Sequence, residues 1–197
     1  EDCRRQRQMC IRDRSLLLLI ILGSFPLVVV GYFIYTSGLI ENLRSLKVIA
    51  WTTLIFGILL FIADRSSIKN KIDTSLSLKN ILIIGIFQIL AVIPGVSRSG
   101  IIITASRFLN FDRVDSSKIS FYLSIPALAG ASILSLKDVM NTNIDLNILF
   151  LYSIIISFIV SYLTIKYFLI YVKNFNLNIF VYYRTFLALI LFVIAYS

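Results

Sequence analysis

The sequence of 197 residues is 58% hydrophobic and only 15% charged, with a mean hydropathy of +0.91. This balance excludes an ordinary soluble domain, because too few charged residues remain to cover its surface. The net charge of +9 does not indicate a nucleic-acid partner, since the basic residues are scattered through short connections between apolar segments.

A helix needs about 20 apolar residues to cross the hydrocarbon core of a bilayer. Several segments approach this length and predict an all-α polytopic membrane protein, with spans at about 15–40, 48–63, 119–136, 146–165 and 179–196. Residues 15–197 are expected to form a single membrane domain. Residues 1–14 are polar and arginine-rich, and they are either a basic flank of the first helix or a foreign segment, disordered or artefactual, which is the interpretation we favour.

The apolar segment from Ile81 to Ile93 is too short to cross a membrane, because its 13 residues would rise only about 20 Å as a helix. Pro94 and Gly95 then break it, and a second short apolar segment follows. Two half-helices that meet at a polar tip predict a re-entrant hairpin over residues 81–111. Such a hairpin requires that its irregular backbone be buried in protein or line a wet cavity.

The distribution of lysine and arginine supports the hairpin. If residues 81–111 enter and leave on one side, that side receives most basic residues of the connections, namely Arg65, Lys69, Lys71, Lys79, Arg113, Lys118, Lys166 and Lys173. The other side receives Arg44, Lys47 and Lys137. By the positive-inside rule, the hairpin is expected to enter from the cytoplasmic side.

The predicted tip carries Ser97, Arg98 and Ser99 between Gly95 and Gly100. The second half-helix would direct its free backbone N–H groups and the positive end of its dipole toward this tip. Arg98 adds a permanent charge with a fork of donors that matches phosphate oxygens, and the glycines allow close approach of backbone to a ligand. The tip therefore predicts an anion site. The alternative is a simple kink, with Arg98 extending to the membrane interface.

Three further polar residues lie within or beside apolar segments. Gln88 could face the pocket or bridge two helices. Arg107 could be a second anion contact, although an anchor at the cytoplasmic face is favoured. Arg184 could belong to the site, but its neighbours Tyr182 and Tyr183 favour an anchor in an aromatic belt. All the aspartates beyond residue 14 fall in predicted connections, so no intramembrane acid is expected.

The motifs Gly85-Ile86-Phe87-Gln88, Ile93-Pro94-Gly95 and Ser97-Arg98-Ser99-Gly100 together resemble the second signature of the bacitracin-resistance family of undecaprenyl-diphosphatases. Further segments that resemble this family are Arg107-Phe108-Leu109, Leu123-Ser124-Ile125-Pro126-Ala127 and Tyr182-Tyr183-Arg184. The resemblance covers residues 15 to 197.

The resemblance implies an enzyme of the bacterial inner membrane, built from inverted repeats. It would hydrolyse undecaprenyl diphosphate to the monophosphate and phosphate, recycling the lipid carrier of peptidoglycan synthesis and conferring bacitracin resistance. The implied catalytic residues are Ser97, Arg98 and Ser99, and the implied substrate-binding residues are Gly95, Gly100, Gln88 and Thr104. The expected cofactor is Mg²⁺ or Ca²⁺ held by ligands outside this chain. The expected partners are the polyprenyl diphosphate lipid, the bilayer and a second copy in a homodimer.

The sequence departs from the family pattern in two respects. It lacks the family's Glu-rich first signature, which ends in Ser-Ser-Thr-Gly-His, so we expect a fragment without the first repeat. The absence of any histidine belongs to the same departure. Ile102 also occupies a position where the motif usually has threonine. The rival functions are a transporter or flippase for an anionic lipid, in which half-helices point at the substrate, and a non-catalytic membrane scaffold.

Overall fold

The computed structural model describes residues 2–37, 43–72, 76–140 and 148–196, and within these ranges the chain folds into helices joined by short connections. The elements are α1 (Asp2–Ser37), α3 (Leu46–Asp64), α5 (Leu78–Ile89), the 3₁₀ turn η1 (Leu90–Val92), α6 (Arg98–Phe108), α7 (Arg113–Met140), α8 (Ile148–Asn174) and α9 (Asn178–Tyr196). No strand occurs in the described part, and its β-structure is limited to one isolated bridge between Asn70 and Phe111. The predicted all-α membrane fold is therefore confirmed.

Four of these helices are long and apolar enough to cross a membrane: Leu16–Ile34 within α1, then α3, Phe150–Asn174 within α8, and α9. Helix α7 contains the predicted span 119–136 but is not one of the four. Its N-terminal half carries Ser116, Ser117 and Ser120, all buried, and lies against α6. These polar side chains of α7 thus face protein rather than lipid.

Helix α1 begins at Asp2 and therefore includes the polar segment that was expected to be disordered. Arginine, glutamine and methionine have high helix propensity, so this segment can continue a helix without apolar periodicity. The expectation of disorder over residues 1–14 is thus replaced by helix from Asp2 onward.

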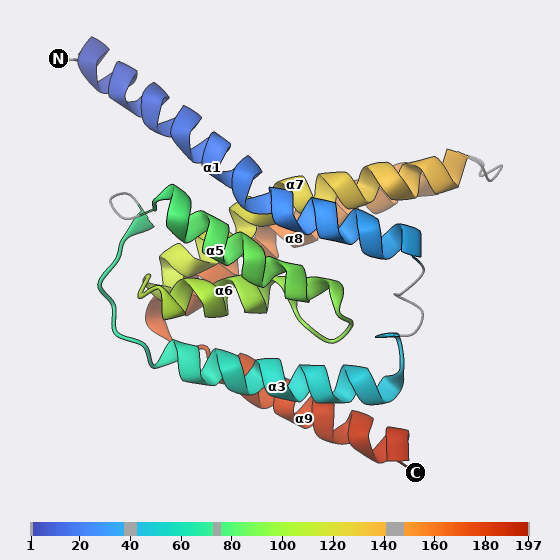
Figure 1. Cartoon of the computed structure of the whole chain (residues 1–197). Helices are drawn as coiled ribbons and strands as arrows, with labels where there is room; N and C mark the ends of the chain where they lie inside the picture. The colour runs from blue at the N-terminus through green and yellow to red at the C-terminus, as the bar shows by residue number, and fades with distance from the viewer. Residues whose placement is uncertain (1, 38–42, 73–75, 141–147, 197) are drawn as a thin grey trace.

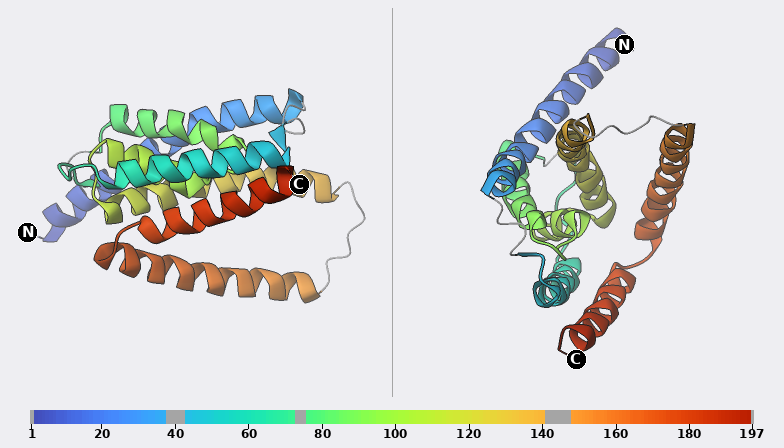
Figure 2. Two further views of the ribbon diagram at one scale, coloured as in Figure 1. Left: turned by 90° about the horizontal axis from the view of Figure 1, so that it is seen from below. Right: turned by 90° about the vertical axis from the view of Figure 1, so that its right-hand side faces the viewer.

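The helices pack in pairs, as Figure 1 shows: α3 lies along α9, α1 crosses α5, and α6 contacts α7 and α3. Helix α8 is set apart from the others in both views of Figure 2, and α7 is its main helical neighbour. Side chains along most of α8 are exposed. In a membrane protein, these exposed apolar side chains face lipid or lipid-like ligands.

The predicted hairpin consists of α5, η1, a tip at residues 93–97, and α6. Its base lies at the end of α3 that carries Asp64, because Arg107 at the end of α6 donates to the carbonyl of Asp64 at 2.9 Å. Its tip contacts Thr52, which is six residues after the start of α3 and hence about 9 Å along that helix. The hairpin therefore enters and leaves at one end of α3 and turns back before reaching the other end.

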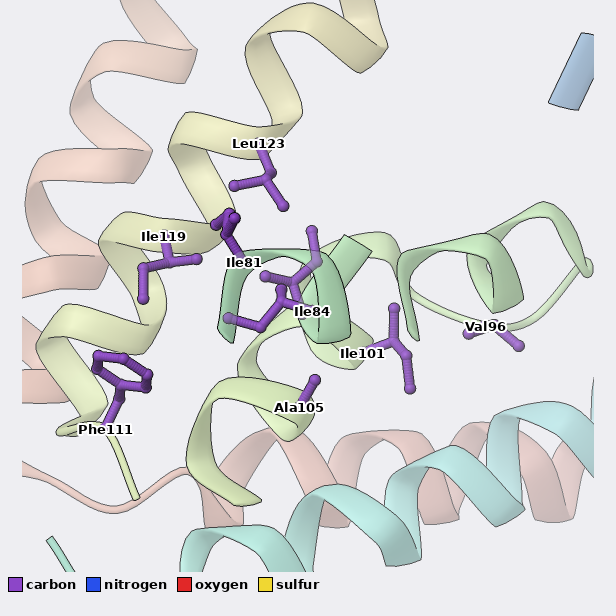
Figure 3. Close-up of a cluster of buried hydrophobic side chains, with 9 residues drawn as sticks. Ile81, Ile84, Val96, Ile101, Ala105, Phe111, Ile119 and Leu123 are labelled. Atoms are coloured by element: carbon purple, nitrogen blue, oxygen red, sulfur yellow. The ribbon is translucent and has the colours of Figure 1, made fainter. Parts of the chain in front are cut away.

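A cluster of buried aliphatic side chains joins the two half-helices to α7 (Figure 3). Its members are Ile81, Ile84, Val96, Ile101, Ile102, Ala105, Phe111, Ile119 and Leu123. Helix α5 also contacts α1 closely, because a Cβ on Gly85 would lie only 2.1 Å from the carbonyl oxygen of Gly23. Small residues that let helix backbones approach are typical of packing in lipid, where van der Waals contact drives association.

Candidate active site

The tip of the hairpin is fixed against α3 by two threonines. Thr52 Oγ1 donates to the Pro94 carbonyl at 2.7 Å, and Thr53 Oγ1 donates to the Gly95 carbonyl at 3.5 Å. Gly95 has a φ of +90°, and a Cβ there would lie 2.2 Å from Thr52 Oγ1 and 2.8 Å from the Ile49 carbonyl oxygen. Only glycine adopts this backbone conformation readily and also fits into this space, so the Pro-Gly break allows the tip to pack closely against α3.

Two hydroxyl groups mark the start of α6. Ser97 is its N-cap residue, and its Oγ accepts a hydrogen bond from the Gly100 N–H at 3.2 Å. The hydroxyls of Ser97 and Ser99 lie 3.2 Å apart and share a hydrogen bond, and Ser120 of α7 donates to the Ser99 carbonyl at 3.4 Å. The positive end of a helix dipole beside two hydroxyls favours a negatively charged ligand.

Arg184 reaches this helix end from α9. Its side chain runs over Gly57 of α3, where a Cβ would lie 3.4 Å from Arg184 Cβ. The Nη1 atom lies 3.5 Å from the position of a Cβ built on Gly100. This nitrogen is buried and has no hydrogen-bond partner among the described residues. A guanidinium without hydrogen-bond partners is energetically costly among membrane helices, so we expect this group to bind an anionic ligand or water.

These groups line a cavity of about 210 Å³. The polar side chains that line it come from the start of α6 and from α9, and the apolar side chains come from α3, α6, α8, α9 and the α8–α9 connection. The full lining is Leu60, Ser97, Ser99, Gly100, Ile103, Phe168, Leu177, Phe180, Tyr183 and Arg184. A water molecule occupies about 30 Å³ in the liquid, so the cavity has room for several waters or a phosphate group. The arrangement is an apolar pocket with a few convergent polar groups, as small-ligand sites usually are.

A buried ion-pair cluster lies at the base of the hairpin, and Asp64 is its centre. Asp64 is 5% exposed, and its carboxylate accepts two hydrogen bonds from Arg113, at 2.6 Å from Nε and 3.0 Å from Nη2. The same carboxylate accepts the Leu177 N–H at 3.3 Å. Arg107 Nε lies 3.8 Å from it. This cluster joins the end of α3 to α6, α7 and the connection between α8 and α9.

Arg107 contributes to the same junction through its other donors. It is 1% exposed, and its guanidinium donates to the carbonyls of Phe111, Asp64 and Ser66. The two sequence interpretations of Arg107, a second anion contact and an anchor at the cytoplasmic face, stay predictions. Arg107 does not line the cavity that contains Ser97 and Ser99. Its function is to close the base of the hairpin onto α3.

Three of the five predicted tip residues reach the cavity, whereas Gly95 and Arg98 do not. Ser97, Ser99 and Gly100 line it, whereas Arg98 is half-buried outside the lining and has no hydrogen bond or ion pair among the described residues. The arginine that enters the cavity is Arg184. The favoured interpretation of Arg184 as an aromatic-belt anchor is therefore wrong, because its guanidinium turns inward between α3 and α6.

The other predicted substrate-binding residues lie around the hairpin rather than in the cavity. Gln88 is fully buried, and neither atom of its amide group has a hydrogen-bond partner among the described residues. Thr104 donates to the Gly100 carbonyl at 2.8 Å, so its hydroxyl is used within α6. Gly95 contacts α3, and Ile102 is buried in the apolar cluster. Direct contact of Gln88, Thr104 and Gly95 with a substrate remains a prediction.

Sequence reasoning missed Asp64, which was assigned to a connection. The sequence contained a signal for it, because an acidic residue at the end of an apolar segment is a candidate for a buried ion pair with an arginine of another segment. The described residues contain no group of three or more His, Cys, Asp or Glu side chains that could hold a metal ion.

The fold and the pocket define a polytopic membrane protein in which an arginine of α9 and two hydroxyls of a re-entrant hairpin line one cavity, and Nη1 of this arginine has no hydrogen-bond partner among the described residues. The sequence matches the family described as "Bacitracin resistance protein BacA" over residues 2–190, and the chain belongs to that family.

Among the relatives, the chain is 55% identical over 186 residues to a protein of Pelagibacter ubique (strain HTCC1062) named undecaprenyl-diphosphatase, and this alignment covers 94% of the chain and 73% of the relative. A protein of Elusimicrobium minutum (strain Pei191) with the same name is 41% identical over 183 residues, covering 93% of the chain and 69% of the relative.

Proposed function

We propose that the protein hydrolyses undecaprenyl diphosphate to undecaprenyl phosphate and inorganic phosphate, and that this chain supplies one part of the active site. The observation that carries the proposal is the buried, unpartnered Nη1 of Arg184 beside the Ser97 and Ser99 hydroxyls at the start of α6. The names of the two relatives support a phosphatase. They give no support to the alternative of a lipid transporter.

The chemistry of the pocket suits a phosphate ester. The guanidinium of Arg184 offers parallel N–H donors to two phosphate oxygens. Ser97 and Ser99 add hydroxyl donors, and the dipole of α6 stabilises negative charge that develops on the leaving phosphate. Arg98, at the first position of α6, is proposed to contact the second phosphate group of the diphosphate.

A divalent cation, Mg²⁺ or Ca²⁺, is retained as part of the proposal, and it would neutralise phosphate charge when bound. Its ligands are expected outside the residues described here, so no step of the mechanism is derived through it. Phosphate release that is lost with a chelator and restored by added Mg²⁺ supports this expectation, and release that is insensitive to the chelator contradicts it.

We also propose the bacterial inner membrane as the location, with the lipid carrier of peptidoglycan synthesis as the physiological substrate and bacitracin resistance as the consequence of its recycling. The positive-inside pattern supports a cytoplasmic position for the base of the hairpin in this proposal. A homodimer is a further part of the proposal, and the mass of the purified protein in detergent tests it.

The central test is Arg184→Ala in the full-length protein, assayed by release of inorganic phosphate from purified undecaprenyl diphosphate in detergent. Loss of a donor that stabilises developing charge typically lowers kcat by about 100-fold or more. Arg44→Ala is the matched control, because Arg44 is an exposed arginine outside the pocket. We expect the control to retain full activity.

Two results would contradict the proposal. If Arg184→Ala turns over as fast as the parent protein, the pocket described here is not where the phosphate binds. If the purified full-length protein releases no phosphate but moves lipid diphosphate across vesicle membranes, the transporter alternative is correct.

A further inference from the structure

One face of α8 forms an apolar groove outside the active-site pocket. The groove has a volume of about 490 Å³ and is lined by Val160, Leu163, Thr164, Tyr167, Phe168, Tyr171 and Phe180. The α8 members recur at spacings of three and four residues, which places them on one stripe of the helix. The stripe runs over 12 residues, from Val160 to Tyr171, and the helical rise between its ends is about 16 Å.

The groove adjoins the active-site pocket. Phe168 of α8 and Phe180 of α9 line both cavities. One side of these two rings therefore borders the pocket that contains Ser97, Ser99 and Arg184, and the groove along α8 begins at the same rings.

The groove is suited to hydrocarbon rather than to a polar ligand. The Thr164 hydroxyl donates to the Val160 carbonyl at 2.7 Å, and the Tyr171 hydroxyl donates to the Asn176 carbonyl at 3.3 Å. The Thr164 and Tyr171 hydroxyls are thus engaged with backbone, and the third hydroxyl of the lining belongs to Tyr167, whose side chain is exposed. The aliphatic members Val160 and Leu163 are 56% and 42% exposed. The pocket thus contains Arg184 and two serines, whereas the adjoining groove is lined mainly by apolar and aromatic side chains. This contrast matches an amphiphile that has a phosphate at one end and a hydrocarbon chain at the other.

We infer that this groove binds the first isoprene units of the substrate's polyprenyl tail while the diphosphate occupies the pocket. This inference rests on the proposed function and adds to it a subsite for the lipid chain. The tail runs along α8 from Phe168 toward Val160, away from the α8–α9 connection, and then continues into the lipid phase. The subsite makes the enzyme discriminate by chain length, because a short diphosphate leaves the groove empty.

The test compares two substrates in the full-length protein in detergent: undecaprenyl diphosphate and dimethylallyl diphosphate, a five-carbon diphosphate with no extended tail. Leu163→Trp narrows the groove at a distance from the phosphate pocket. The control is Ile155→Trp, which places the same ring on an exposed position of α8 outside the groove. We expect Leu163→Trp to lower kcat/KM for the undecaprenyl substrate about tenfold, corresponding to the loss of about two buried methylene groups.

We expect the short substrate to be hydrolysed equally by the parent and by both variants. Equal loss on both substrates, or no loss on either, overturns the inference, whereas absence of phosphate release by the parent refutes the proposed function instead. As a measurement independent of folding in the tryptophan variant, a photoreactive phenylalanine analogue replaces Leu163. Cross-linking to undecaprenyl diphosphate is the expected result. Cross-linking to protein, whether a second copy or another segment, overturns the inference.

Discussion

The buried ion pair between Arg113 and Asp64 provides the strongest prediction about stability. Arg113→Ala removes two short hydrogen bonds, at 2.6 and 3.0 Å, from a carboxylate whose side chain is 4% exposed. The remaining partners are weaker, because Leu177 N lies at 3.3 Å and Arg107 Nε at 3.8 Å. Breaking a buried pair typically costs 3–5 kcal/mol, and the surviving contacts place the expected loss near the lower value, about 3 kcal/mol.

Thermal unfolding of the detergent-solubilised protein measures this loss, and about 3 kcal/mol corresponds to a fall in Tm of roughly 6–12 °C for a chain of this size. The control is Arg65→Ala, because Arg65 is exposed and its guanidinium lies over the Phe61 ring, with Cζ 4.1 Å from the ring centroid. Its removal should cost less than about 1 kcal/mol. Combining Arg113→Ala with Asp64→Asn removes both charges and should restore part of the lost stability. A double variant less stable than Arg113→Ala alone would refute the reasoning, since the unpaired carboxylate would then not be the cause.

Two further predictions concern the packing of the hairpin. Gly85→Ala forces α5 away from α1, because the added Cβ would lie 2.1 Å from the Gly23 carbonyl oxygen, and this should lower the free energy of unfolding by about 1–3 kcal/mol. The control Gly31→Ala, whose Cβ would meet nothing within 4 Å, should be neutral or stabilising. Equal effects of the two variants on thermal unfolding would contradict the close approach of α1 and α5. Thr52→Val removes the hydrogen bond to the Pro94 carbonyl and should cost about 1 kcal/mol together with a loss of phosphate release. Unchanged activity in that variant would show that the seating of the tip on α3 does not position the site.

The helical architecture and the hairpin could be predicted from the sequence because they depend on local properties. Apolar length gave the spans, and the shortness of the segment before Pro94 indicated the turn within the membrane. The N-cap of α6 at Ser97 likewise depends on nearby residues, since a serine before a helical segment meets the orphan N–H of Gly100. These features require no knowledge of which helix lies beside which.

The partners across helices could not be predicted in the same way. Arg184 enters the pocket because Gly57, in a helix more than 120 residues earlier, leaves room for its side chain. Asp64 is buried because Arg113 and Leu177 approach it from distant segments. Each of these residues has an equally sensible local role, as a belt anchor or as part of a polar connection. Tertiary packing decides between the roles, and a single sequence does not contain that packing explicitly.

Helix α3 supports both halves of the pocket at once. Thr52 and Thr53 hold the turn that precedes Ser97, and one helical turn further along, Gly57 receives the stem of Arg184. The separation between the guanidinium and the hydroxyls is consequently set by the internal dimensions of one rigid helix. Changes in bilayer thickness that tilt the outer helices would move the whole pocket as a unit, so its internal geometry can persist across membranes of different lipid composition.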